Sequence, residues 1–183
     1  MKFRTLAQEL KWDESQALDF RQIRRILDSS GGKAHGLHAG YVDLESVHGA
    51  YDLKRFLPRG HNACCILLTA YIGGSVQRHW TSLVRNSKGL FFFDSLDLGL
   101  ATLTKVLDDG GKFSNFLKKI GANLNNKKVQ ADHKKVRTCG LHTAVRIFCW
   151  QMSNASYLEY LLSMTNCISP DTLVALLTVI GHL

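Results

Sequence analysis

Apolar residues recur at helical spacing at both ends of the chain, and shorter apolar runs fill its middle. Apolar side chains at positions 17, 20, 23 and 27, with arginines between them, predict an amphipathic helix over Asp13–Leu27. A Ser-Ser-Gly-Gly stretch then ends that helix. A second helix is expected over Cys139–Met152, and apolar segments follow at Tyr157–Met164 and, just after Pro170, at Asp171–Ile180.

The middle of the chain favours short strands. The apolar run Ala63–Leu68 fits either a buried strand or the start of a buried helix. His79–Val84 and Leu90–Phe93 predict two strands joined by a turn at Asn86–Gly89. Smaller elements are expected around them: helical pieces at Leu103–Leu107 and Phe113–Ile120, a strand near Val129 and Gln130, and a loop-rich stretch up to about Gly60. Helices at both ends with strands between them predict an α+β fold, and the length predicts a single domain over residues 1–183.

The predicted hairpin brings two titratable side chains together. Its turn lies midway between His79 and Asp94, and residues equidistant from a hairpin turn face one another with Cβ atoms about 5 Å apart. A slip of one residue would place the two side chains on opposite faces. A carboxylate beside a histidine fixes its tautomer and stabilises the imidazolium, as a catalytic base requires. The alternative is a surface ion pair on the hairpin.

Cys139 is the candidate nucleophile among five cysteines, at positions 64, 65, 139, 149 and 167. It starts a predicted helix, whose N-terminus favours the thiolate, and Gly140 would let a substrate backbone come close. The alternative is a small buried apolar side chain, which we assign to Cys64, Cys65 and Cys149. The odd count and irregular spacing argue against a disulfide framework or a zinc site, so no cofactor and no metal are expected.

Gln130 stands nine positions before Cys139 and could donate to a developing oxyanion together with the backbone N–H of Cys139. The formal net charge is +8, and much of the excess lies between positions 118 and 137. This basic stretch comprises Lys118, Lys119, Lys127, Lys128, His133, Lys134, Lys135 and Arg137. A solvated basic face and a phosphate-binding surface both fit it. The longest apolar run near the end is too short to cross a bilayer, so no membrane partner is expected.

In chain order, these residues resemble the adenovirus protease (adenain) and ubiquitin-like protease superfamily of cysteine proteases. The resemblance rests on His79-Trp80, an Asp after an apolar strand, Gln130 and Cys139-Gly140. Leu90–Ser95 is similar to the apolar strand ending in Asp-Ser on which the superfamily carries its acid. Gly49–Pro58 is similar to the virophage and Polinton-type branch.

The resemblance implies a role for each matching residue. Cys139 would be the nucleophile, His79 the general base, Asp94 the orienting acid and Gln130 the oxyanion donor. Asp97 competes with Asp94 as the acid. Papain-like enzymes place the cysteine before the histidine, unlike this chain. Chymotrypsin-like viral proteases share the order found here, but their cysteine lies on a loop rather than at a helix start.

The resemblance also implies a fold and a function. The fold would be a mixed central β-sheet flanked by helices, of the adenain/papain-like kind. The activity would be cleavage of viral capsid or core precursors during virion maturation, after small residues such as glycine. The alternative is a protease that deconjugates a ubiquitin-like protein. We expect a monomer, in the virion and in the host-cell cytoplasm, with DNA as a candidate partner of the basic stretch.

Overall fold

A five-stranded mixed sheet lies between two groups of helices in the computed structural model, which describes residues 8, 14–15, 17–29, 36–72, 74–131 and 136–180. The strands are β1 (Ala39–Asp43), β2 (Ala63–Ile72), β3 (Ser75–Asn86), β4 (Gly89–Phe93) and β5 (Asn123–Leu124). The helices are α2 (Phe20–Ser29), α3 (Leu53–Phe56), α4 (Gly99–Val106), α5 (Lys112–Lys119), α6 (Cys139–Phe148), α7 (Asn154–Ser163) and α8 (Pro170–Ile180), with a 3-10 turn at Glu45–Val47. The predicted α+β class, with a mixed sheet flanked by helices, is confirmed.

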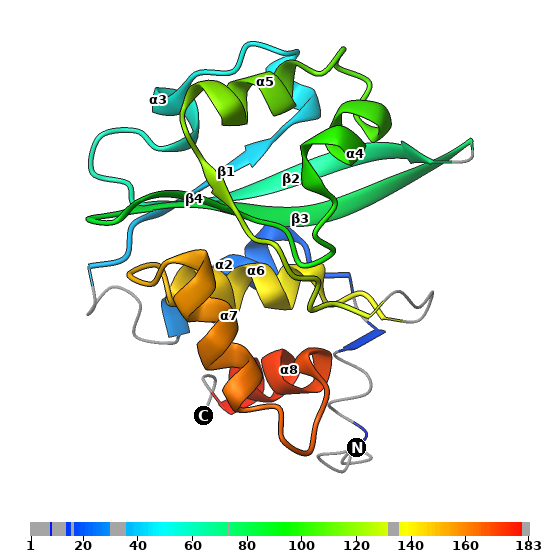
Figure 1. The fold of residues 1–183 in the computed structure, drawn as a ribbon. Helices are drawn as coiled ribbons and strands as arrows, with labels where there is room; N and C mark the ends of the chain where they lie inside the picture. Colours follow the sequence, from blue (N-terminus) through cyan, green and yellow to red (C-terminus); the bar gives the residue numbers. More distant parts are fainter. Residues whose placement is uncertain are drawn as a thin grey trace.

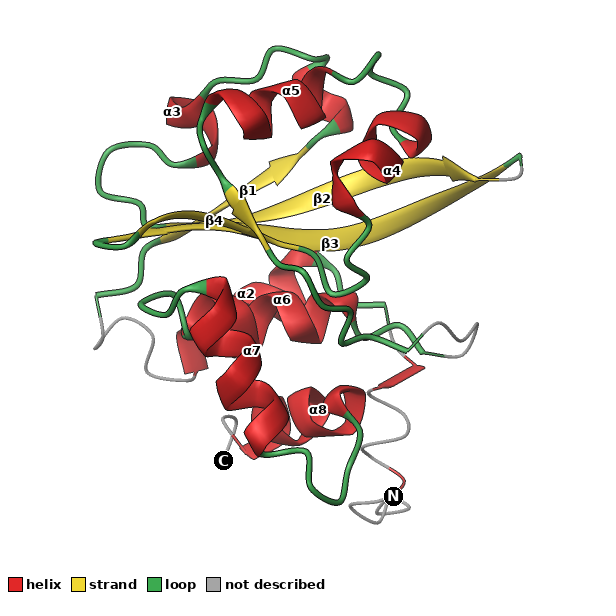
Figure 2. Cartoon of the chain, viewed as in Figure 1, coloured by secondary structure: helices red, strands yellow, loops and turns green. Residues whose placement is uncertain are grey.

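The two helical groups cover opposite faces of the sheet (Figure 2). Helices α3, α4 and α5 lie on one face, and α2, α6, α7 and α8 lie on the other. Strand order follows chain order; β1 runs parallel to β2 and β5 parallel to β4, whereas the β2–β3 and β3–β4 pairs are antiparallel. The N-terminus of α6 meets the sheet near β3, which places the first residue of α6 beside that strand.

Strand β2 shows why the apolar run Ala63–Leu68 could not be assigned from its pattern. Cys64, Ile66 and Leu68 pack into the core under α3–α5, while the odd-numbered residues pack into the core beside α6. A strand that is covered on both faces has no polar face, so its sequence lacks the alternation that marks a strand. The run is a buried strand, and the helix alternative is wrong.

The first predicted helix is not continuous, since Glu14 and Ser15 are helical and a break follows before α2. Helix α2 begins at Phe20, and residues 17–19 are not helical. The reason is a reciprocal cap: the Asp19 carboxylate accepts from the Gln22 backbone N–H, and the Gln22 side chain accepts from the Asp19 N–H, both at 2.8 Å. This Asp-x-x-Gln signal lies within the apolar periodicity that predicted a longer helix.

Two other regions differ from the prediction. The stretch predicted as loops up to Gly60 contains β1 and the short α3, whose start is capped by the Asp52 carboxylate. Val129 and Gln130 do not form a strand; their backbone N–H groups both donate to the Ser95 carbonyl, at 2.9 and 3.0 Å. None of the helices in the described parts of the chain is both long and apolar enough to cross a membrane.

Candidate active site

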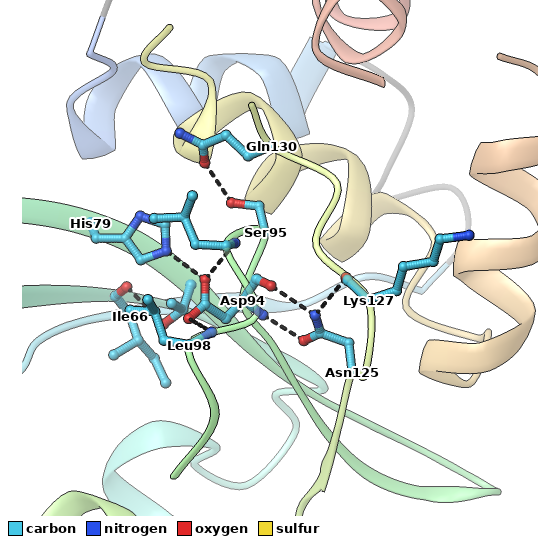
Figure 3. A network of polar contacts seen from close by, with 10 residues as sticks. Ile66, His79, Asp94, Ser95, Leu98, Asn125, Lys127 and Gln130 are labelled. Atoms are coloured by element: carbon cyan, nitrogen blue, oxygen red, sulfur yellow. Dashed lines mark hydrogen bonds and ion pairs between the residues drawn. The ribbon is translucent and has the colours of Figure 1, made fainter. Parts of the chain in front are cut away.

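His79 and Asp94 meet in a buried contact. His79 Nε2 lies 2.7 Å from Asp94 Oδ1, with the two residues 7% and 2% exposed (Figure 3). The predicted register was wrong by two residues: Ser82 pairs with Phe93, so the same register places Asp94 opposite Thr81 rather than His79. Because side chains two residues apart share a face, this slip keeps both groups on one side of the sheet. The diagonal contact replaces the direct one.

The Asp94 carboxylate sits in a ring of donors at the end of β4. It accepts from the backbone N–H of Leu96 at 2.8 Å and of Leu98 at 3.3 Å. The Asn125 side chain holds the Asp94 backbone through both its N–H and its carbonyl, at 2.8 and 2.7 Å. Burial alone would raise the pKa of Asp94. The hydrogen bond and charge of His79, together with the backbone amides of Leu96 and Leu98, hold that pKa below its usual value. Asp94 is therefore a fixed, ionised partner for the imidazole.

Cys139 adds a third group to the His79–Asp94 pair. It is the first residue of α6 and is 8% exposed. Strand β4 ends at Phe93, whose partner on β3 is Ser82, so β4 does not cover the edge of β3 at Trp80. The Trp80 backbone N–H donates to the Cys139 sulfur there, and the His79 side chain bonds the same sulfur. Because Nε2 of His79 is occupied by Asp94, Nδ1 is the nitrogen that faces the thiol.

The electrostatics of Cys139 differ from those of three other cysteines. Burial opposes ionisation, but the hydrogen bond and charge of His79, with the amides of Trp80 and Gly140, hold the pKa of Cys139 below its usual value. Burial raises the pKa of Cys65 to about 12, and it also raises the pKa of Cys64 and Cys149. The environment of Cys139 therefore favours a thiolate, and those of the other three favour the thiol.

His79 is the matching cation. Burial would lower the pKa of His79, but the hydrogen bond and charge of Asp94, reinforced by Cys139, raise it to about 10. The lowered pKa of Cys139 and the raised pKa of His79 have one cause, because each charge stabilises the other. The arrangement favours a thiolate–imidazolium pair, which is the reactive form of a nucleophilic cysteine.

Gln130 lies above His79 and Asp94 in the view of Figure 3, and it precedes α6 in the chain. Its Oε1 accepts from the Ser95 hydroxyl at 2.7 Å, and Ser95 directly follows Asp94 in the chain. Since the carbonyl end of the Gln130 amide is held in this way, its N–H₂ end is left to donate. Cys139, His79 and Asp94 are thus in contact where α6 meets β3, and Gln130 bonds the residue that follows Asp94.

The structure explains the glycine at position 140 by close packing against Leu18 and not by the approach of a substrate. A Cβ atom at Gly140 would lie 2.9 Å from the Leu18 Cβ, which is closer than real side chains approach. The Leu18 carbonyl in turn accepts from the Trp80 indole N–H at 2.7 Å. The space over Gly140 is therefore taken by the segment before α2, and the expectation that it serves substrate approach is not supported by this packing.

The structure also gives the positions of Asp97, the alternative acid, and of the basic stretch. Asp97 does not contact His79; its backbone N–H bonds the Asp94 carbonyl, and its φ of +51° places it in the tight turn after β4. His142, on α6, is fully buried. In the basic stretch, Lys118, Lys119, Lys127, Lys128 and Arg137 are exposed, whereas His133, Lys134 and Lys135 lie outside the described residues.

The structure contains a second buried His–Asp pair, which the sequence does not predict. His142 Nε2 lies 3.1 Å from Asp171 Oδ1, and the Thr138 hydroxyl donates to the same oxygen. Asp171 Oδ2 accepts from the Ala131 backbone N–H at 2.9 Å. The only signals available were a threonine before the candidate nucleophile and an acid in the first turn of a predicted helix. Neither signal identifies a partner at long range in the sequence.

Among the described residues, no group of three or more His, Cys, Asp or Glu side chains is arranged to hold a metal ion. All five cysteines are free. In comparisons with known proteins, the sequence matches no family model and no curated protein.

Proposed function

We propose that this protein is a cysteine endopeptidase, with Cys139 as nucleophile, His79 as general acid and base, Asp94 as the orienting acid and Gln130 as an oxyanion donor. One observation carries the proposal: the buried chain of contacts from the Cys139 sulfur through the His79 ring to the Asp94 carboxylate. The helix N-terminus and the pKa directions of these groups add to it.

The chemistry follows from this order of groups. The Cys139 thiolate attacks the carbonyl carbon of a peptide bond, and the negative charge moves to the carbonyl oxygen. Donation from the Gln130 N–H₂ and from the backbone N–H of Cys139 stabilises that oxygen. The imidazolium of His79 then gives its proton to the leaving amine as the C–N bond breaks, which leaves a thioester on Cys139.

Hydrolysis of the thioester uses the same groups in reverse. The neutral His79 ring takes a proton from water, and the hydroxide attacks the thioester carbon. The C–S bond breaks, the carboxylic product leaves, and the thiolate–imidazolium pair forms again. Asp94 keeps its charge throughout and holds the imidazole with Nδ1 toward the sulfur.

We propose viral capsid or core precursors as substrates, cut after small residues such as glycine during virion maturation. This substrate class rests on the resemblance of the site residues to adenain-like proteases. DNA is the proposed partner of the exposed lysines of the basic stretch, whose charge suits a polyanion. Both the virion and the host-cell cytoplasm are the proposed locations.

The test of the activity is covalent labelling with a peptide vinyl sulfone that ends in glycine. Wild type is compared with Cys139→Ala and His79→Gln, and the site of modification is located by mass spectrometry. We expect modification at Cys139 that is lost in both variants. Cys167→Ser is the matched control, because Cys167 is an exposed cysteine that no part of the mechanism uses; this variant should label like wild type.

Two results would overturn the proposal: modification of Cys167 at the same rate as Cys139, or labelling of Cys139 that does not depend on His79. Digestion of capsid precursors and of ubiquitin-like proteins with Gly-Gly tails then separates the two substrate classes. Cleavage of the tails alone would favour a deconjugating protease over a maturation protease.

A further inference from the structure

The Asp171 carboxylate joins the two segments that carry Gln130 and Cys139. It lies in the first turn of α8 and is 3% exposed. Its Oδ2 accepts from the backbone N–H of Ala131, the residue after Gln130, at 2.9 Å. Its Oδ1 accepts from the hydroxyl of Thr138, the residue before Cys139. One side chain thus bonds the direct neighbours of both groups.

The carboxylate is itself held in place. His142, one turn after Cys139 on α6, lies with Nε2 3.1 Å from Asp171 Oδ1. Burial would raise the pKa of Asp171, but the hydrogen bonds from His142 and Thr138, the charge of His142 and the Ala131 amide lower it. His142 Nδ1 is buried without a partner among the described residues. A hydrogen on Nε2 lets the His142 ring donate to Asp171.

We propose that Asp171 is a positioning residue, which sets the separation between the Gln130 amide and the Cys139 sulfur so that both meet one carbonyl group. This inference rests on the proposed function. Gln130 is anchored on its other side by Ser95. The bonds to Asp171 add a direct link between the two segments, beside the path through Ser95, Asp94 and His79. A displacement of about 1 Å can lower a rate about 100-fold.

Asp171 acts through Gln130 in this proposal, so a double-mutant cycle tests it. Asp171→Asn keeps the size of the side chain but replaces one acceptor oxygen with a donor. We expect kcat on a peptide substrate to fall about 10- to 100-fold with a small change in KM. In a Gln130→Ala background, the same change should have little further effect, because the group that it positions is already absent.

Alkylation of Cys139 by iodoacetamide supplies the second measurement. This reaction needs the thiolate but forms no oxyanion, so Asp171→Asn should leave its rate nearly unchanged while hydrolysis falls. If Asp171→Asn does not fold, Thr138→Val and Thr138→Ser replace it. Valine removes the hydroxyl that donates to Asp171 and should lower kcat, whereas serine keeps the hydroxyl and should recover it. Asp108→Asn is the matched control, because Asp108 is exposed and lies between α4 and α5, the helices that cover the opposite face of the sheet.

The outcomes separate the two proposals. Equal loss of hydrolysis and of alkylation, or a loss from Asp171→Asn that adds in full to that of Gln130→Ala, overturns the positioning role and leaves the protease proposal standing. For the Thr138 variants, equal hydrolysis by the valine and serine forms does the same. Failure of wild type to hydrolyse any peptide, with alkylation of Cys139 independent of His79, overturns the proposed function and this inference with it.

Discussion

Two buried His–Asp pairs lie on either side of the N-terminus of α6, and they differ in the order of their groups. In the first, His79 stands between Asp94 and the Cys139 sulfur. In the second, Asp171 stands between His142 and the Thr138 hydroxyl. Thr138 and Cys139 are neighbours in the chain, yet each faces a different member of its pair. The comparison shows that a His–Asp pair alone does not define a catalytic site.

The order of groups decides the chemistry. A thiol beside an imidazole can pass its proton to the ring, and the carboxylate behind the ring stabilises the resulting charge. A hydroxyl that donates straight to a carboxylate has no strong base to activate it, because the carboxylate is a weak base and here accepts two further hydrogen bonds, from His142 and the Ala131 amide. The first pair therefore suits a nucleophile and the second suits an anchor. Four predictions test this contrast, beginning with the largest effect.

Replacing the two histidines should separate the pairs most clearly. We expect His79→Gln to lower kcat/KM for peptide hydrolysis by about 1,000-fold or more, because it removes the base and the cation that stabilises the thiolate. His142→Gln should lower kcat/KM by about 10-fold or less, since it only loosens Asp171. Steady-state kinetics on both variants measures the difference. Equal losses would erase the proposed distinction between the pairs.

The pH dependence reports on the first pair. Between the lowered pKa of Cys139 and the raised pKa of His79, about 10, the thiolate–imidazolium pair predominates, so hydrolysis should decline only as pH approaches 10. Asp94→Asn removes the bond and charge that raise the pKa of His79. The alkaline decline should therefore move to lower pH, with a loss of rate of about 10-fold or more. A pH–rate profile that keeps its alkaline limb in this variant would contradict the orienting role of Asp94.

The second pair should matter more for folding than its small kinetic effect suggests. His142→Gln removes a fully buried donor to Asp171 and leaves that carboxylate with fewer partners. We expect the free energy of unfolding to fall by about 1–3 kcal/mol. Urea unfolding followed by circular dichroism measures this change. An unchanged midpoint would show that the His142–Asp171 bond adds nothing to stability.

The smallest effect is expected for Asp97, the alternative candidate for the orienting acid. Asp97 contacts neither histidine of the two pairs through any described bond, and its side chain is partly exposed. Asp97→Asn should change kcat/KM by less than about twofold, as surface substitutions usually do. A loss as large as that of Asp94→Asn would show that Asp97 also acts on the catalytic histidine, which contradicts the choice of Asp94 as the orienting acid.

Local features of the sequence were sufficient to predict the first pair, His79 and Asp94. The hairpin turn at Asn86–Gly89 and the period of two along a strand place His79 and Asp94 on one face, even though the predicted register was wrong by two residues. The start of a helix at Cys139 was also predictable. Both depend on residues near each other in the chain, so short-range rules apply to them.

The second pair could not be predicted in the same way. Asp171 meets Thr138 and Ala131 across 33 and 40 positions in the chain, and Ser95 meets Gln130 across 35. Strand β1 was missed for a similar reason, because its place in the sheet depends on pairing with β2. Contacts of this range carry no periodic signal in the sequence.

The sequence by itself determined the α+β class, the His–Asp face of the hairpin and the helix that begins at Cys139, because each depends on short-range geometry. Only the tertiary structure decided the rest. The end of β4 at Phe93 leaves the Trp80 amide for the Cys139 sulfur, and the packing of α8 against α6 brings Asp171 to the segments of Gln130 and Cys139. Those contacts form because distant apolar faces must share one core, which no local rule specifies.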